Sequence, residues 1–164
     1  MFDKNILIDM VIAALERDKA SAEAGLASAR ESAKEAPSAM ESHSDTTRSQ
    51  MQHLAENLEK DIQEKESGIM ALGDFKTSVG PAKGDVSVGS VVSITDEAER
   101  RFIYFILPAG GGTKVETDGA SITVLSSTAP LAQALIGKRA GETVSFSAGA
   151  KVRMLKIIGI EYVF

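Results

Sequence analysis

The sequence predicts an α+β protein in which an N-terminal antiparallel helical hairpin precedes a small antiparallel β domain with one short helix. Apolar residues recur at helical spacings up to about residue 75, whereas glycine and β-branched residues dominate beyond residue 80. Between these halves, Gly80, Pro81 and Gly84 interrupt any regular pattern. The predicted parts are the hairpin at 1–75, the linker at 76–86 and the β domain at 87–164.

The hairpin is predicted from two apolar stripes, one from Ile8 to Ala33 and one from Met51 to Leu72. Their members recur three, four or seven residues apart, which places them on one face of each helix. Pro37 lacks an N–H donor and disfavours helix in the residue before it, so the first helix should end near it. We expect two antiparallel helices of roughly 28 residues, joined by a tip near residues 35–45. Because the seam nearest this tip is mostly alanine, the helices there should lie close together.

The second half contains short β-branched and aromatic runs separated by turn residues, a pattern typical of strands. The expected strands are Val88–Thr95, Phe102–Leu107, Gly119–Leu125, Val144–Phe146 and Val152–Val163. One to two helical turns are expected at Ala129–Ile136, with Thr128 as the cap and Gly137 as the stop. Gly110–Gly112 is expected to be a flexible hairpin loop, since no Lys-Ser/Thr pair follows it as in a phosphate-binding loop.

Composition excludes several classes of function. The chain has no cysteine, which rules out disulfides, thiolate zinc sites and cysteine nucleophiles. A net charge of −5 argues against a sequence-reading DNA binder. The absence of tryptophan and an aromatic content of 5% argue against an aromatic-lined pocket. We read the apolar start, Ile6 to Leu15, as part of a mature helix and not as a secretory signal, and expect a cytoplasmic protein.

Three segments of the second half carry a family resemblance: Ile122–Val124, Ala129–Lys138 and Ala140–Val144. The middle segment reads Ala-Pro-Leu-Ala-Gln-Ala-Leu-Ile-Gly-Lys, and a Gly-Glu-Thr-Val step follows it. This chain thereby resembles the Gre (GreA/GreB) transcript-cleavage factors, in particular their divergent compact relatives. The order of the domains agrees with that family across nearly the whole chain. The resemblance implies an FKBP-like β domain and a regulator of transcription elongation that is not itself an enzyme.

The resemblance also implies a mechanism. In this family the β domain docks on RNA polymerase at the rim of the secondary channel, which assigns docking to Thr128, Pro130 and Leu131. The hairpin enters the channel, and two acidic residues at its tip help to hold a magnesium ion with which the polymerase cleaves its own RNA. Contact with RNA and DNA would then be indirect, through the elongation complex.

The tip departs from the family pattern of an Asp followed three positions later by a Glu. Aligned through the second helix, Glu41 falls on the Glu, whereas Ser38 replaces the Asp. Compact relatives carry Asp-Lys-x-Glu-Thr, and against that pattern Ser42 replaces the Asp while Asp45 stands for the Glu. One acid of the pair is missing in either alignment. A single exposed carboxylate binds magnesium weakly, so we expect no stably bound cofactor and discount cleavage stimulation.

Alternatives remain open at this point. The tip acids Glu35, Glu41 and Asp45 are either magnesium ligands or solvated turn residues, and the second reading is favoured. Glu41 and Asp45 could still form a metal pair that supports transcript cleavage. A coiled-coil adaptor with another protein partner, and self-association through the apolar base of the hairpin, are further alternatives. A prolyl isomerase is disfavoured by the scarcity of aromatic residues. The interleaved helix bases, such as Lys19 and Arg30, are read as a solvated face.

Overall fold

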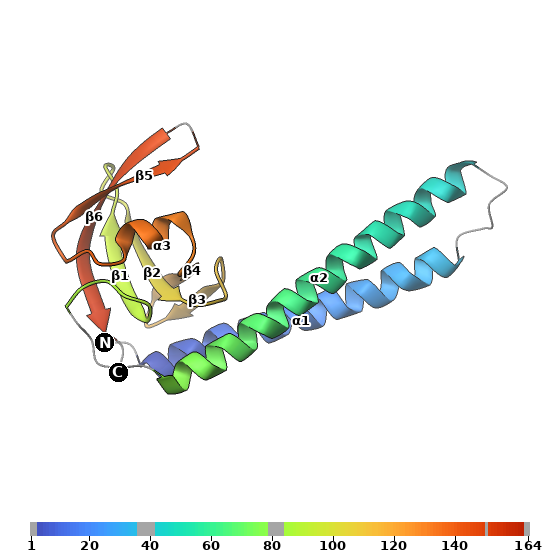
Figure 1. Ribbon diagram of the computed structural model, residues 1–164, viewed down its shortest axis with the longest axis horizontal. Coiled ribbons are helices and arrows are strands. Elements are labelled where there is room, and N and C mark those ends of the chain that lie inside the picture. The colour runs from blue at the N-terminus through green and yellow to red at the C-terminus, as the bar shows by residue number, and fades with distance from the viewer. Residues whose placement is uncertain (1–2, 36–41, 79–83, 150, 163–164) are drawn as a thin grey trace. The chain divides into compact units, whose positions relative to one another are not determined.

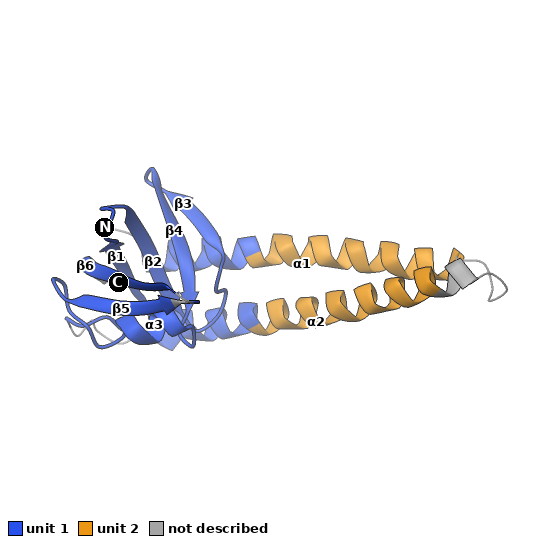
Figure 2. Ribbon diagram, turned by 90° about the horizontal axis from the view of Figure 1, so that it is seen from above, with its two compact units in different colours: residues 1–14, 68–164 blue, residues 15–67 orange. Residues whose placement is uncertain are grey.

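The computed structural model describes residues 3–35, 42–78, 84–149 and 151–162 (Figure 1). It forms two compact units, one of residues 1–14 and 68–164 and one of residues 15–67 (Figure 2). The described elements are α1 Lys4–Glu35, α2 Ser42–Ser78, β1 Ser90–Thr95, β2 Arg101–Leu107, β3 Lys114–Thr117, β4 Ala120–Ser126, α3 Pro130–Leu135, β5 Thr143–Ala148 and β6 Lys151–Tyr162. Over these ranges, no helix is both long and apolar enough to cross a membrane.

Ion pairs show that α1 and α2 run antiparallel. Lys19 pairs with Glu66, and Arg30, further along α1, pairs with Glu59, which lies earlier in α2. The predicted hairpin is therefore confirmed, and α1 ends at Glu35, just before Pro37.

Both helices exceed the predicted length of roughly 28 residues, with 32 residues in α1 and 37 in α2. The difference arises because polar residues beyond the apolar stripes continue each helix. In the last turn of α2, the hydroxyls of Thr77 and Ser78 donate hydrogen bonds to the carbonyls of Asp74 and Phe75, at 2.8 and 3.1 Å. The helix thus continues through Lys76, where the sequence had placed the start of a linker.

The sheet has six strands in the order β3-β4-β2-β1-β6-β5. Neighbouring strands pair antiparallel except β2 and β4, which are parallel from Ile103↔Ile122 to Leu107↔Ser126. The sheet is consequently mixed, and the expectation of a purely antiparallel sheet was wrong for this pair. The cause is β3, a strand that the sequence reading missed. Its hairpin with β4 turns back through Asp118 and Gly119, both at positive φ, and places β4 between β3 and β2.

The segment at Gly110–Gly112 crosses from β2 to β3 and is not the hairpin loop that was expected, because β4 lies between those strands. The N–H of Gly112 donates to the Val124 carbonyl at 2.9 Å, and the N–H of Val124 donates to the Thr113 carbonyl at 2.8 Å. A Cβ on Gly111 would lie only 3.0 Å from the backbone nitrogen of Ser126. Glycine thus allows the crossing chain to lie against the end of β4.

The β domain buries apolar residues on both faces of its central strands. One cluster contains Val92, Ile94, Ile106, Leu155 and Ile157 from the sheet, with Ala132 and Leu135 from α3. In β2, Phe105 and Leu107 are also fully buried, although they alternate with Ile106. Burial of both faces explains why the sequence of β2 is continuously apolar and does not alternate.

Candidate functional site

The predicted docking residues lie where β4 ends and α3 begins. Thr128 and Pro130 are exposed, whereas Leu131, also in α3, is half-buried and packs against the core of the β domain. Pro130 takes the first position of the helix, where its missing N–H costs no helical hydrogen bond. The arrangement exposes the start of the helix and buries the face behind it.

Thr128 does not cap α3, contrary to the prediction. The N-cap is Ala129, which makes no side-chain cap hydrogen bond. Instead, the Thr128 hydroxyl lies 3.0 Å from the Ser126 hydroxyl. The side-chain amide of Gln133 closes the turn by donating to the Ser127 carbonyl at 2.5 Å. The predicted helix stop is confirmed, since α3 ends at Leu135 and Gly137 has a φ of 82°.

Hydrogen bonds and packing hold this segment at both ends. The Ser127 N–H donates to the Leu107 carbonyl at 2.7 Å, which ties the start of the segment to β2. At its other end, the Gly137 N–H donates to the Val86 carbonyl and the Val86 N–H to the Lys138 carbonyl, both at 2.8 Å. The segment is thus fixed on the sheet at both ends. Thr128, Pro130 and Leu131 carry no group that titrates near neutral pH.

The predicted acidic tip is only partly described. Glu35 is the last residue of α1 and is exposed. Glu41 lies outside the described residues, and so does the side chain of Asp45, although its backbone belongs to α2. Elsewhere in the described part of the chain, no three acidic or histidine side chains gather as a metal site would require. The assignment of Glu41 and Asp45 as a magnesium pair therefore stays a prediction.

The basic residues of the hairpin are engaged by acidic neighbours. The ammonium of Lys19 lies 2.8 Å from Glu66 and 3.7 Å from Glu23, and its hydrogen bond to Glu66 raises the pKa of Lys19. Arg30 pairs with Glu59. These pairs support the prediction that the interleaved charges form a solvated helix face.

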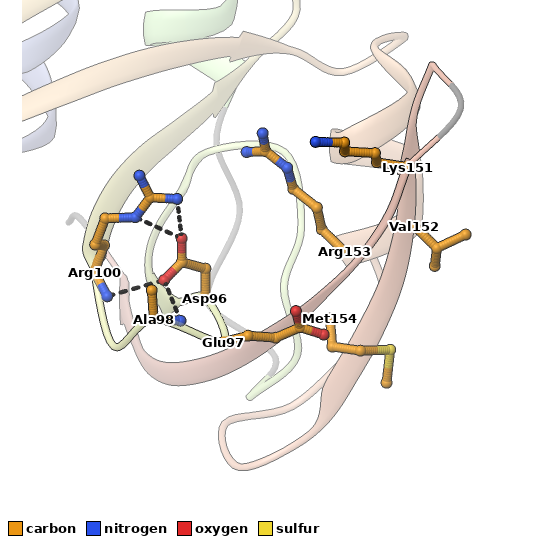
Figure 3. Close-up of a pocket in the computed structure, with 8 residues that line it drawn as sticks. All are labelled: Asp96, Glu97, Ala98, Arg100, Lys151, Val152, Arg153 and Met154. Carbon is orange, nitrogen blue, oxygen red and sulfur yellow. Dashed lines mark hydrogen bonds and ion pairs between the residues drawn. The ribbon is translucent and has the colours of Figure 1, made fainter.

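A second charged region, not expected from the sequence, lies between the β1–β2 turn and the start of β6 (Figure 3). The Asp96 carboxylate accepts hydrogen bonds from the backbone N–H groups of Ala98 and Arg100, both at 3.0 Å, and from Nε of Arg100 at 2.8 Å. The hydrogen bond from the Arg100 side chain is the main reason that the pKa of Asp96 is lowered. The Asp96 carboxylate therefore stabilises the β1–β2 turn in which it lies.

The start of β6 reads Lys151-Val152-Arg153-Met154, and all four side chains are exposed. Figure 3 shows Lys151 and Arg153 pointing one way and Val152 and Met154 the other. The alternation of cationic and apolar residues was visible in the sequence. It was read only as part of a strand, because the exposure of both faces depends on the tertiary structure.

Residues 81–162 match the family model of the transcription elongation factor GreA/GreB C-terminal domain. The chain belongs to the GreA/GreB family. The matched span contains all six strands and α3, and with them the surface of Thr128 and Pro130. The GreA/GreB family comprises transcription elongation factors, so the resemblance seen at Ala129–Lys138 is confirmed at the level of the family.

Solved structures of Gfh1 are among those similar to the chain. The transcription factor Gfh1 is 17% identical with a TM-score of 0.40, over 92% of this chain and 93% of that chain. GreA factor homolog 1 of Thermus thermophilus is 19% identical with a TM-score of 0.38, over 92% and 94%. Gfh1 of Thermus aquaticus is 17% identical with a TM-score of 0.39, over 90% and 92%. No curated protein matches the chain. The assignment to the family therefore rests on the family model.

Proposed function

We propose that this GreA/GreB-family protein regulates transcription elongation by docking its β domain on RNA polymerase and inserting its hairpin into the secondary channel. The observation that carries the proposal is the family match of the β domain, which includes the exposed residues Thr128 and Pro130. The protein itself catalyses no reaction in this proposal. Its location would be that of its polymerase, in the cytoplasm, and its contact with nucleic acid would be indirect.

The hairpin is built in a way that suits a narrow channel. Ala22 and Ala29 are buried in its seam, and Leu58 of α2 lies 3.5 Å from where a Cβ on Gly25 would be. Small residues at these positions allow the helix axes to approach closely, which reduces the width of the pair. The ion pairs of Lys19 with Glu66 and of Arg30 with Glu59 link the two helices at two positions along the hairpin.

In the proposal the hairpin occupies the channel and does not stimulate transcript cleavage. Serine stands at one of the two acidic tip positions in either alignment with the family. A second catalytic magnesium needs several oxygen ligands, and one exposed carboxylate supplies too few to hold it. Glu41 and Asp45 together remain the alternative ligand pair.

Docking is tested by retention of RNA polymerase on the immobilised protein at low salt. Thr128→Glu should weaken retention by about tenfold, because it places a charge in the contact surface. Ser121→Glu is the matched control, since Ser121 is also an exposed hydroxyl residue of the β domain and lies on β4. If the unaltered protein retains no polymerase, the proposal fails, and a coiled-coil adaptor with another protein partner becomes the favoured alternative.

Cleavage is tested separately, in stalled elongation complexes with a titration of magnesium. The proposal expects the RNA to keep its length when the protein is added. If the RNA shortens, and if Glu41→Gln with Asp45→Asn abolishes the shortening, the cleavage-factor alternative replaces the channel-occupying role. Docking would stand in either case.

A further inference from the structure

The sheet ends in two edge strands of different character. β3, at one edge, carries the exposed charged residues Lys114 and Glu116. β5, at the other edge, reads Thr-Val-Ser-Phe-Ser-Ala and contains no charge and no proline. Natural proteins commonly protect an edge strand with charged residues, proline or a bulge, because its free N–H and C=O groups can pair with another chain. The edge of β5 lacks such residues.

α3 packs against β5 on the side of Val144, and the side chains on the other face of this strand are short and exposed. Thr143, Ser145 and Ser147 are short and exposed. On the adjacent strand β6, Val152 is 63% exposed and Met154 is 43% exposed. They lie opposite Ser147 and Ser145, respectively. A strand added beside β5 would run about 10 Å from β6, and side chains from it could pass over these serines to reach Val152 and Met154.

The same end of the sheet carries cations without carboxylate partners. Among the ion pairs of the described residues, none includes Lys151, Arg153 or Lys156. The sequence from residue 143 to 158 contains no acidic residue, in a chain whose net charge is −5. This stretch is therefore basic, although Glu97 of the β1–β2 turn lines the same pocket as Lys151 and Arg153.

We propose that β5 and the start of β6 bind an extended acidic segment of a partner protein, which adds to the sheet as a seventh strand. The backbone of the segment pairs with β5. Its carboxylates lie on the side of Lys151 and Arg153, and its apolar side chains lie on the side of Val152 and Met154. The alternation along β6 thus specifies an alternation of acidic and apolar residues in the partner. The proposal does not depend on the proposed docking at Thr128 and Pro130.

Charge and composition favour this occupant over two others. A second copy of the chain, paired through its own β5, would bring the same unpaired cations to both sides of the contact. Nucleic acid would use the cations but would leave the exposed Val152 and Met154 and the backbone of β5 without partners. An acidic strand uses all three features.

The test is titration of the full-length protein with a fluorescent peptide of about eight residues, a length typical of strands. The peptide alternates glutamate with leucine, whose side chain is long enough to extend across β5. Saturable binding is expected, together with slower hydrogen–deuterium exchange of the amides of β5. The control peptide has the same composition, but its acidic residues form one block and its apolar residues another. It should bind more weakly, because it cannot match the alternation along β6.

Lys151→Glu combined with Arg153→Glu should weaken binding on the order of fivefold or more, since each exposed attraction becomes a repulsion. Each of the two single substitutions should weaken it in the same direction, whereas Lys114→Glu, which reverses one charge on the opposite edge strand, should leave the affinity unchanged. Ser145→Lys places a charge on the edge itself and should reduce the protection of the β5 amides. Circular dichroism of each variant checks that the fold is retained.

The outcomes separate the occupants. Peptide binding without protection of the β5 amides would overturn the proposed strand addition. Tighter binding of a single-stranded oligonucleotide than of the peptide would overturn it in favour of nucleic acid. A dimer in analytical ultracentrifugation that Ser145→Lys dissociates would overturn it in favour of self-pairing. Equal weakening by Lys114→Glu would show that only the overall charge matters, and would also contradict the proposal.

Discussion

At the scale of single residues, Asp96 and Gly111 show how one side chain, or its absence, fixes a connection. The Asp96 side chain is 8% exposed, and its carboxylate closes the β1–β2 turn through two backbone N–H groups and the Arg100 side chain. Gly111 has no side chain and thereby permits the crossing from β2 to β3 to touch Ser126. Both positions act on backbone geometry more than on the apolar core.

The lowered pKa of Asp96 predicts a dependence of stability on pH. Because its pKa is lower in the folded than in the unfolded protein, the ionised carboxylate stabilises the fold above the ordinary aspartate pKa of about 3.9. This stabilisation is lost as the pH falls through the lowered folded value. Asp96→Asn should therefore lower Tm at neutral pH, and the difference from the unaltered protein should shrink in acid. Thermal unfolding of both proteins from about pH 7 to about pH 3 measures this difference in Tm. A difference that stays constant with pH would contradict the prediction.

Gly111→Ala should destabilise the β domain, since the new methyl group would lie 3.0 Å from the nitrogen of Ser126. Gly73→Ala is a suitable control, because Gly73 is exposed in α2 and a Cβ there would meet nothing within 4 Å. That change should stabilise the protein by about 1 kcal/mol, through the higher helix propensity of alanine. Urea unfolding of both variants gives the two free-energy changes. If both substitutions changed the free energy of unfolding in the same direction, the assigned role of Gly111 would be contradicted.

At the scale of elements, the seam of the hairpin has little room for larger residues. Ala22 is 7% exposed on the inner face of α1. Ala22→Leu should destabilise the hairpin by about 1–3 kcal/mol, because a larger side chain forces the helices apart. Ala24→Leu, on the exposed face of the same helix, should have little effect. Helical circular dichroism during urea unfolding measures both. Equal losses for the two variants would show that the seam is not tightly packed.

Elements set by local pattern were predictable from the sequence, whereas pairings between distant segments were not. The stripes and Pro37 predicted both helices because helical periodicity is a local property. The strand β3 escaped notice because Val115 is its only buried residue, although Asp118-Gly119 is a turn signal that could have revealed it. The parallel pairing of β4 with β2 then followed from that missing strand. The assignment of Thr128 as a cap was wrong by one residue, which is the usual uncertainty of a helix end.

The candidate functional residues divide in the same way. Pro130 and Leu131 are docking candidates because a short segment of sequence resembles a family, and the structure shows that Pro130 is exposed and Leu131 half-buried. The acids Glu41 and Asp45 stay predictions, since their side chains lie outside the described residues. The cations of β6 were missed because nothing local indicates that a charged side chain lacks a partner.

At the scale of the whole molecule, the two long helices and the β domain can be followed by different signals. Helical circular dichroism comes almost wholly from α1 and α2, since α3 has only 6 residues. The chain has no tryptophan, and both of its tyrosines, Tyr104 and Tyr162, lie in the β domain. Intrinsic fluorescence therefore reports the β domain alone.

We expect the two signals to give different urea midpoints, because a chain of more than one unit need not unfold in a single step. Leu135→Ala should shift the fluorescence midpoint more than the helical one, since Leu135 is fully buried in the β-domain core. A loss of about 2–5 kcal/mol is typical of such a change. Coincident midpoints that move together in the variant would show that the chain unfolds as one cooperative unit.

The position of β6 has a consequence for how the protein is made. β6 is the last strand along the chain, yet it lies between β1 and β5 and pairs with both. While the ribosome is still synthesising residues 151–162, β1 lacks one of its two neighbours and β5 has no strand partner at all. The hairpin, by contrast, can form as soon as α2 has emerged. A nascent chain should therefore present a finished hairpin on an unfinished sheet, and a premature stop before β6 should yield a product that chaperones and proteases recognise.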